Sequence, residues 1–265
     1  MEGTQIERPC DHSRETGNRL SGRVVPVTAL SGGQLAQLYS LREMFFTSVT
    51  PGQFEDTILA KHWAILLVDP STGGIQGFST IKRIETIIDG GRVVAYSSGE
   101  TAVHPSHWGQ AELPRVAGSH IMAMAEGERD ARAYWFLITS SYRTYRFLPL
   151  FFRDYCPKRG SPVTKEMRRT LEKLAFQEFG EEYDPASGVI RFDGATPLLR
   201  EYAVIPSHRT GDPDIAFFAR VNPGYLSGEE LACLAALNRE NLTPAGLRIL
   251  ARGSLRPKEE APRLR

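Results

Sequence analysis

The residues between Ser97 and Met124 have the types and the spacing that ligand binding would need. An apolar strand is predicted to end near Val103, a turn that contains Gly109 follows, and a helix is predicted to begin at about Glu112. The first N–H groups of a helix lack partners within it and carry a partial positive charge, so they can bind phosphate with backbone atoms alone. The segment therefore predicts an anion site for a ligand that carries a diphosphate.

Titratable side chains lie on the predicted strand and on the turn after it. The period of two in a strand places Ser98, Glu100, Ala102 and His104 on one face. Histidine as a residue type titrates close to neutrality, so His104 and the nearby His107 could relay a proton. The alternatives are a carboxylate on a solvated strand face and histidines at a surface turn, and both interpretations stay open at the level of the sequence.

A second polar group follows the apolar run over 134–139, which reads as a buried strand. Ser140 and Ser141 come directly after this run and could hydrogen-bond an acceptor substrate. Arg143 and Arg146 could bind a carboxylate or a phosphate, although arginine is also common on exposed helix faces.

The sequence does not contain the residue patterns expected of a cysteine nucleophile, a metal site or a serine nucleophile elbow. Cys156 is the only cysteine near this segment, and a cysteine nucleophile would also need a base and a lowered pKa. The sequence has neither an H-x-x-x-H spacing nor clustered carboxylates typical of a metal site, and it has no G-x-S-x-G elbow. We therefore expect a site without a metal and without a covalent intermediate.

The elements that carry these residues can be placed from periodicity. Apolar spacings of three and four predict helices, and β-branched or aromatic runs predict strands. The first half is expected to form helices over 33–49 and 54–61, strands over 63–68, 75–88 and 92–104, a helix over 112–126, a strand over 134–139 and a helix over 145–155. Asp89-Gly90-Gly91 predicts a tight turn between the second and third of these strands.

The second half has a weaker pattern, which predicts a helix over 164–179, strands over 188–192 and 214–221, and a strand or short helix over 229–237. The class is mixed α+β. The chain divides into a disordered N-terminus (1–22), a core (23–160), a C-terminal α+β extension packed on the core (161–255) and a flexible tail (256–265).

Composition limits the possible partners and locations. The 265 residues are 41% hydrophobic and 24% charged, with a formal net charge of +1, so no global field favours nucleic acid or an anionic membrane. Three cysteines without C-x-x-C spacing predict neither a disulfide framework nor a zinc site, and they favour a reduced cytoplasmic setting. The N-terminus has no apolar stretch of signal-peptide type, and no apolar run reaches the length of a membrane span.

The turn after the predicted strand carries a family resemblance. GNAT acyltransferases end their fourth strand in a V-x-P-like step, followed by a pyrophosphate loop of the form Arg/Gln-Gly-x-Gly-x-Gly/Ala and a helix. The matching residues here are Val103-His104-Pro105 and then Trp108-Gly109-Gln110-Ala111-Glu112-Leu113. Gly109 stands as in the family, whereas Trp108, Ala111 and Leu113 depart from it. An alternative frame over 115–120 would cut into the predicted helix.

The resemblance covers about residues 30–250 and is similar to a bacterial GNAT-like group of unknown acceptor. The stretches that carry it are Trp63-Ala64-Ile65-Leu66-Leu67, Gly77-Phe78-Ser79-Thr80, Ser98-Gly99-Glu100-Thr101, Tyr134-Trp135-Phe136-Leu137-Ile138, Arg143-Thr144-Tyr145-Arg146-Phe147-Leu148 and Asn222-Pro223-Gly224-Tyr225. It implies a GNAT-like fold, in which a mostly antiparallel sheet splays between its fourth and fifth strands and is flanked by helices.

The resemblance also implies roles for particular residues. The pantetheine arm of an acyl-CoA donor would lie in the splay, along the backbone of Ala102 and Val103. The loop that binds the donor would comprise Trp108, Gly109, Gln110, Ala111, Glu112 and Leu113. Glu100 would act as the base, with His104 as a relay, and Tyr145 would protonate the leaving thiolate, with Tyr142 as its competitor. Either tyrosine could instead simply pack. Substrate contacts are expected from Ser98, Ser140, Ser141, Tyr142 and Arg143.

Three functions fit these expectations. The first is direct transfer of an acetyl or longer acyl group from acyl-CoA to an amine of a small molecule in a ternary complex. The second takes the acyl group from acyl carrier protein, as N-acyl amino acid synthases do, and would need a basic docking patch such as Arg143, Arg146, Arg153, Lys158 and Arg159. The third is an acyl-CoA-binding module without catalysis. The acceptor, the acyl length and the oligomeric state are not encoded in any pattern we recognise.

Overall fold

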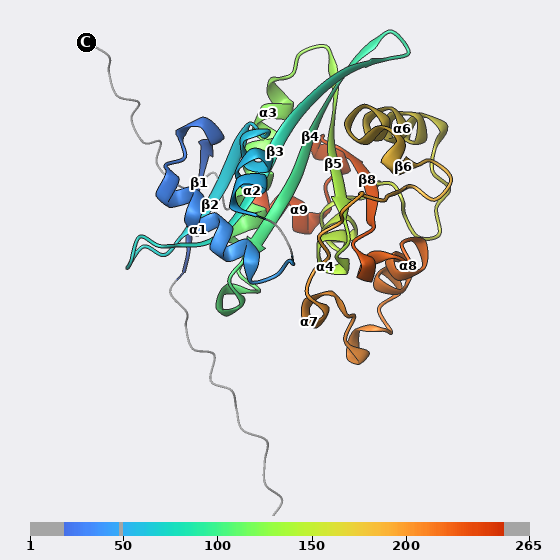
Figure 1. The fold of residues 1–265 in the computed structure, drawn as a ribbon. Helices are drawn as coiled ribbons and strands as arrows, with labels where there is room; N and C mark the ends of the chain where they lie inside the picture. Colours follow the sequence, from blue (N-terminus) through green and yellow to red (C-terminus); the bar gives the residue numbers. More distant parts are fainter. Residues whose placement is uncertain (1–18, 48–49, 252–265) are drawn as a thin grey trace, which may run out of the picture.

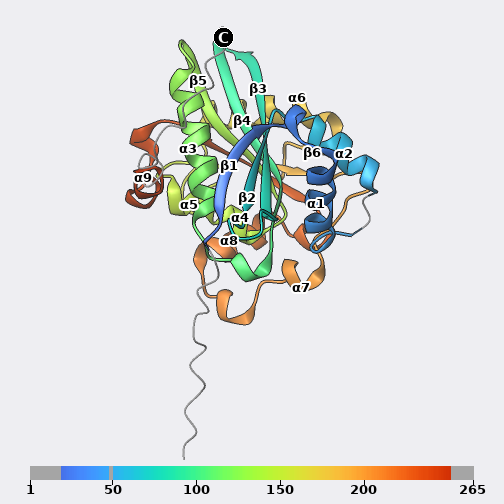
Figure 2. The same ribbon diagram turned by 90° about the vertical axis from the view of Figure 1, so that its left-hand side faces the viewer.

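A computed structural model describes residues 19–47 and 50–251 as one eight-stranded sheet with helices on both faces (Figures 1 and 2). The expected disorder over 1–22 and the expected tail over 256–265 lie almost wholly outside these residues, but Ser21 and Gly22 already belong to the first strand. None of the described helices is both long enough and apolar enough to cross a membrane.

The strands lie in the order β1-β2-β3-β4-β5-β8-β7-β6. Their bounds are β1 Ser21–Pro26, β2 Trp63–Val68, β3 Ile75–Ile88, β4 Gly91–Val103, β5 Ala131–Thr139, β6 Tyr183–Asp184, β7 Val189–Ile190 and β8 Glu230–Ala236. Every neighbouring pair is antiparallel except β4 and β5, which run parallel. The predicted class, a mixed α+β fold with a mostly antiparallel sheet between helices, is confirmed.

Helices lie on both sides of the sheet, as Figure 2 shows. Their bounds are α1 Gly32–Glu43, α2 Pro51–Leu59, α3 Glu112–Gly127, α4 Tyr142–Tyr145, α5 Phe147–Phe151, α6 Lys165–Phe179, α7 Arg200–Ala203, α8 Pro213–Val221 and α9 Pro244–Ala251. Short 3-10 turns include η1 Val27–Ala29, η2 Pro105–His107, η3 Gly180–Glu182, η4 Ser207–Arg209, η5 Tyr225–Ser227 and η6 Arg239–Asn241.

The core has three apolar clusters because the sheet is covered on both faces. One cluster lies on the face of α3, α8 and α9 and includes Val94 and Tyr96 of β4. The other two lie on the opposite face, one under α6 and one under α1 and α2. The second face therefore has a boundary between two separate cores, and polar side chains lie along it.

Strands β4 and β5 separate at their C-terminal ends. Their parallel pairing begins at Arg92↔Ala131 and its last pair is Ser98↔Leu137, although β4 continues to Val103. The predicted splay is therefore present in the sheet. We call the opening between Gly99–Val103 and the end of β5 the fork.

A β-bulge bends β4 at the start of the fork. Phe78 of β3 faces Ala102 and Thr80 faces Gly99, so Ser79 alone stands opposite both Glu100 and Thr101. Glu100 takes a φ of 44°, in the left-handed region that non-glycine residues seldom adopt. An extra residue of this kind bends a strand and ends regular pairing, which gives a local cause for the fork.

Several predicted elements need correction. The strand predicted over 214–221 is helix α8, because Asp212 caps it by accepting from Ile215 N–H and Pro213 occupies its first turn. The helix predicted over 145–155 is replaced by the short α4 and α5, which are interrupted at Arg146 and contain Pro149. The helix predicted over 33–49 ends at Glu43, and its last two positions lie outside the described residues.

Two strands complete the picture of the sheet. β1 had no counterpart among the predicted elements. The segment over 229–237, predicted as a strand or a short helix, is strand β8 and pairs with β5 from Tyr134↔Ala236 to Thr139↔Leu231. The C-terminal third of the chain therefore supplies an interior strand of the sheet rather than only an outer layer.

Candidate active site

Glu100 lies at the bulge and is held by an arginine from helix α1. Its carboxylate accepts a hydrogen bond from Arg42 Nε at 2.7 Å, in an ion pair whose side chains are 9% (Arg42) and 21% (Glu100) exposed. Arg42 also donates to Thr196 Oγ1 at 3.1 Å, and its guanidinium lies 4.4 Å from the ring centre of Phe46. The carboxylate is thus accessible to a ligand but has a fixed counter-charge.

The predicted shared face of β4 is wrong for Ser98. The Ser98 hydroxyl accepts from Trp135 Nε1 at 2.9 Å, on the side of the sheet where Trp135 packs on the α3 core. Glu100 and Ala102 instead face α1, because the extra residue at the bulge reverses the alternation. Ser98 therefore lies on the opposite face from Glu100.

The end of β4 presents backbone groups to the fork, and one of them is already bonded. His104 N–H donates to Gln76 O of the neighbouring strand, so the backbone groups of Val103 point the other way. Trp108 Nε1 donates to Val103 O at 2.7 Å. The indole of Trp108, which is 45% exposed, thus lies against the strand end that was predicted to bind the donor.

The turn from His104 to Ala111 is compact and internally hydrogen-bonded. His104 Nδ1 bonds Ser106 Oγ at 2.7 Å, and His107 N–H donates to His104 O. Gly109 has a φ of 88°, and a side chain added there would meet no atom within 4 Å. The turn leads directly into α3, as the anion-site prediction requires, and the alternative frame over 115–120 falls inside that helix.

A buried carboxylate occupies the first turn of α3. Glu112 is 3% exposed, accepts from Gly22 N–H at 3.0 Å and forms an ion pair with Arg115. Gln110 accepts from Leu20 N–H at 3.2 Å, so both side chains tie β1 to this turn. These contacts give Gln110 and Glu112 structural partners, while Ala111 caps the helix without a side-chain bond and Leu113 packs on the core.

Aromatic rings and an arginine gather around Trp108. Phe45 and Tyr202 lie 6.1 and 5.6 Å from its ring centre, and the guanidinium of Arg143 lies 5.3 Å from it. Arg143 also stacks on Tyr142 at 4.8 Å and donates to Tyr202 O. This set, which we call the Trp108 cluster, joins the loop after β4 to α4 and α7.

The C-terminal third reaches this cluster through the residues before α7. Leu199 N–H donates to Phe45 O at 2.7 Å, and Leu198 forms an isolated bridge with Phe46. Since Thr196 also bonds Arg42, the segment from Thr196 to Tyr202 runs along the end of α1 next to the fork. Sequence reasoning left the role of this region undefined.

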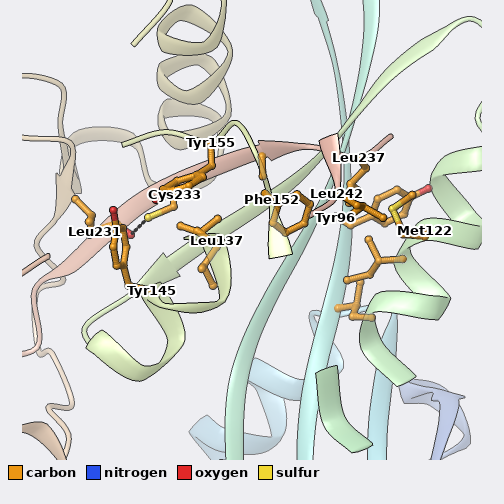
Figure 3. Packing of buried hydrophobic residues seen from close by; sticks show 14 of the residues in the cluster. Tyr96, Met122, Leu137, Tyr145, Phe152, Tyr155, Leu231, Cys233, Leu237 and Leu242 are labelled. Carbon is orange, nitrogen blue, oxygen red and sulfur yellow. Dashed lines mark hydrogen bonds between the residues drawn. The ribbon is translucent and has the colours of Figure 1, made fainter. Parts of the chain in front are cut away.

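Tyr145 does not have the surroundings of a proton donor. It is fully buried, and its hydroxyl donates to Pro157 O at 2.9 Å. Figure 3 shows its ring packed beside Leu231 and Cys233, and burial raises the pKa of Tyr145 far above its usual range. The packing alternative considered for this tyrosine describes its surroundings better.

The residues after β5 shape the start of α4. Ser141 Oγ accepts from Arg143 N–H at 3.3 Å as the helix cap, and Thr139 Oγ1 accepts from Ser141 N–H at 2.9 Å. Ser140 and Tyr142 are buried at 9% and 5% exposure. Of the predicted substrate contacts, Ser141 therefore has a clear structural role, and Ser140 lies at the end of β5 beside β8.

Two charged residues that sequence reasoning missed lie near Glu100. Glu230 is the first residue of β8, and Lys61 precedes β2. Burial and then the Glu100 charge raise the pKa of Glu230 to about 7, whereas burial lowers the pKa of Lys61. Arg42 could have been suspected, since it follows Leu38 by four residues and so shares the buried face of α1 with it. Glu230 had only the weak signal of a carboxylate at the start of an apolar run.

The remaining candidates have ordinary surroundings. Cys156 is buried, which raises its pKa to about 12 and disfavours a thiolate. Among the described residues no group of three or more His, Cys, Asp or Glu could hold a metal ion. The proposed basic docking patch is engaged within the chain: Arg146 pairs with Asp212, Arg159 with Asp214, and Arg153 and Lys158 donate to Leu242 O and Arg153 O.

No protein-family model and no curated protein matches this chain. Among solved structures it is similar to a conserved Enterococcus faecalis protein of unknown function, a probable N-acyltransferase, at 14% identity and a TM-score of 0.38, over 51% of this chain and 33% of that one. It is also similar to glucosamine-6-phosphate N-acetyltransferase from Arabidopsis thaliana, at 14% identity and a TM-score of 0.35, over 55% and 95%.

A third similarity spans more of the chain. A Mycobacterium tuberculosis protein in complex with CoA and NLQ matches at 11% identity and a TM-score of 0.39, over 82% of this chain and 99% of that one. These likenesses are too low to assign the chain to a family.

Proposed function

We propose that the protein is a GNAT-like acyltransferase that moves an acyl group from acyl-CoA to an amine of a small molecule by direct transfer. The observation that carries this proposal is the fork: β4 runs on for five residues after its last pair with β5, along the bulge at Glu100. An unpaired strand end of this kind can bind an extended ligand as an added strand would. The pantetheine arm of coenzyme A is such a ligand.

The donor would run from the fork to the turn before α3. Backbone groups of Val103 would bond the arm, with those of Thr101 in place of the predicted Ala102, because strand alternation turns the Ala102 backbone toward β3. The first turn of α3 with Gly109 would receive the diphosphate. Trp108 would have to give up its bond to Val103 O, or share that region with the arm. The open space beside Gly109 supports this path.

The acceptor amine would approach from the face of α1, where Glu100 lies. Acyl transfer needs an uncharged amine, a hydrogen-bond donor for the thioester oxygen and a proton for the leaving thiolate. Glu100 can orient an amine with its carboxylate while Arg42 fixes that carboxylate in place. The Tyr145 hydroxyl is buried and already donates to Pro157 O, which does not suit an acid for the leaving thiolate. We therefore expect the thiolate to take its proton from another source.

A carrier-protein donor is the second candidate, and one observation favours it. The Glu112 carboxylate lies in the first turn of α3, where it offsets part of the positive helix-end charge that would attract the diphosphate of coenzyme A. A carrier protein brings phosphopantetheine without the adenosine diphosphate and would avoid this carboxylate. The internal pairing of the basic side chains weighs against the docking patch that such a partner needs. The third candidate, a binding module without catalysis, requires only the fork.

Donor binding separates these candidates. Isothermal calorimetry with acetyl-CoA, with acetyl-phosphopantetheine and with acetylated acyl carrier protein compares the three donors directly. The proposal expects acetyl-CoA to bind, and a ligand at 100 times its Kd to stabilise the protein by about 2.7 kcal/mol. Binding of only the carrier protein would favour the second candidate, and no binding of any donor would contradict all three. We also propose a cytoplasmic location, which the free thiols of Cys156 and Cys233 support.

A further inference from the structure

Glu230 has an unusual position for a carboxylate. It begins β8 directly before Leu231, whose partner is Thr139 at the end of β5. The parallel pair Ser98↔Leu137 sets the register of β4 and β5, so Glu100 lies at nearly the same level on the other side of β5. Glu100 and Glu230 therefore flank the strand end at which the fork opens.

The side chain of Glu230 points to the same face as Glu100. Ala232 and Leu234, two and four residues further along β8, belong to the core under α6, and alternation places Glu230 with them. Glu100 faces α1 on this side of the sheet. The two carboxylates thus lie on the boundary between the α1–α2 core and the α6 core.

The two carboxylates differ in their partners. Glu100 has Arg42 at 2.7 Å, whereas the side-chain carboxylate of Glu230, a half-buried residue, has no ion-pair or hydrogen-bond partner among the residues that the structure describes. The charged groups that act on it are Glu100 from β4, Arg42 from α1 and Lys61 from the segment before β2. Arg42 stabilises the charged form of Glu100, whereas no such partner stabilises the charged form of Glu230. Glu230 is therefore the carboxylate better suited to gain and lose a proton.

We propose that Glu230, from the C-terminal third of the chain, accepts the proton of the acceptor amine, and that the Arg42–Glu100 pair serves as a fixed counter-charge beside it. This assignment rests on the proposed acyltransferase function and gives it a specific base. A carboxyl whose pKa is about 7 is matched to removing a proton at neutral pH.

The reaction balances with Glu230 in this role. The Glu230 carboxylate takes one proton from the ammonium group and leaves a neutral amine. The nitrogen lone pair attacks the thioester carbonyl carbon, the C–N bond forms, and the C–S bond breaks with its electron pair leaving on sulfur. The second nitrogen proton passes to the thiolate through solvent, and Glu230 returns its proton to water. Amide and thiol are the products, with one proton released.

The titration of Glu230 can be measured without knowing the acceptor. Protein carrying carbon-13 in its glutamate carboxyl groups is titrated by NMR as wild type, Glu230→Gln, Glu100→Gln and the control Glu240→Gln, which changes an exposed residue of η6. We expect one carboxyl to titrate near neutrality, to vanish in Glu230→Gln and to titrate at lower pH in Glu100→Gln, because a like charge is removed. An ordinary acidic titration for the resonance lost in Glu230→Gln would overturn the proposal.

The catalytic role needs a pair of acceptors that differ in charge. Acetyl-CoA is the donor, and the acceptors are primary alkyl amines, charged at pH 7, and hydroxylamine, which is mostly uncharged there. We expect Glu230→Gln to slow transfer to alkyl amines by at least about 100-fold and to affect hydroxylamine little, because only the former needs a base. Equal losses for both acceptors, or no loss for either, would overturn the role of Glu230.

Different results would contradict the proposed function and the assignment of Glu230 as its base. If acetyl-CoA does not bind wild-type protein in calorimetry, or if wild-type protein acetylates neither acceptor, the acyl-CoA function is wrong, and the role of Glu230 as its base is wrong with it. If acetyl-CoA binds, wild-type transfer occurs and Glu230→Gln is fully active, only the assignment of the base is wrong. Glu240→Gln should keep the carboxyl resonance that titrates near neutrality and should match wild type in donor binding and in transfer to both acceptors.

Discussion

Arg42 and Glu100 constrain each other at the bulge of β4. Each carries a charge with little access to water, and each has the other as its nearest opposite charge. A pair of this kind costs desolvation when it forms, yet removing one partner is worse because the other charge is left buried and unpaired. The pair therefore fixes the position of the bulge as well as the carboxylate that faces the proposed acceptor.

Glu100→Gln should consequently destabilise the protein while it tests the site. We expect a loss of about 2 kcal/mol in the free energy of unfolding by urea, less than for a fully buried pair because Glu100 retains some exposure. The double variant Arg42→Met with Glu100→Gln should recover part of this loss. Additive losses in the double variant would contradict the coupling. Turnover should fall in Glu100→Gln with the Kd of acetyl-CoA unchanged.

Gly109→Asp should weaken donor binding through charge and backbone strain together. A φ of 88° disfavours any side chain, and the new carboxylate would face the proposed diphosphate. We expect the Kd of acetyl-CoA, measured by calorimetry, to rise about tenfold or more, which corresponds to about 1.4 kcal/mol. Gly90→Asp is the matched control, since Gly90 also has a positive φ and open space but lies in the β3–β4 turn. Equal weakening by both variants would remove Gly109 from the site.

At the residue scale, sequence analysis identified the strand and turn that carry the candidate site but missed the residues from other parts of the chain that lie beside them. Glu100, Val103 and Gly109 do lie on a strand, its end and the following turn, as predicted. Ser98 was placed on the wrong face because a bulge at a non-glycine residue leaves no clear pattern in the sequence. Glu230 was missed because its nearness to Glu100 depends on pairing between strands that are far apart in the chain.

Elements with strong local signals were predicted well. Helices α3 and α6 and the β3–β4 hairpin follow from regular apolar spacing and from the Asp89-Gly90 turn. Helix α8 was mistaken for a strand because its aromatic and branched residues outweighed the cap and proline at its start. Strand β1 was overlooked because Val24 and Val25 are its only β-branched residues and it follows a polar segment.

At the scale of elements, the bond between Trp108 in the loop after β4 and the end of that strand can be tested by mutation. Trp108→Phe keeps an aromatic ring in the Trp108 cluster but removes the N–H that donates to Val103 O. If the donor arm must displace that bond, the variant should bind acetyl-CoA several-fold more tightly, since one hydrogen bond contributes about 1 kcal/mol. The Kd from calorimetry tests this. Weaker binding would mean that the indole supports the donor instead of competing with it.

At the scale of the whole molecule, the sheet joins the first and last parts of the described chain. β8 lies between β5 and β7, so the C-terminal third is continuous with the strands that form the fork (Figure 1). The same third supplies Thr196 to Arg42 and Tyr202 to the Trp108 cluster. The division at residue 160 stays a prediction, and residues from both sides of it surround the fork. We propose that the two parts fold as one unit.

Glu230 should also be visible in the pH dependence of stability. Its pKa is raised to about 7 in the fold from an unfolded value of 4.5, so the folded state holds an extra proton between these values and stability falls as pH rises through that window. Glu230→Gln removes this penalty. We expect the variant to exceed wild type by up to about 3 kcal/mol above pH 7 and to lose that advantage near pH 4. Urea unfolding at both pH values checks this, with Glu240→Gln expected to show no such gain.

The position of β8 has a consequence for how the protein is made. About 90 residues separate the end of β5 from β8, so at about 5–20 residues per second a ribosome needs roughly 5–20 seconds to supply the missing neighbour. During that interval the hydrogen-bonding groups along the free side of β5 are open to other chains. Nascent chains should therefore depend on chaperones at this stage, and chains that stall before β8 should aggregate more readily than complete ones.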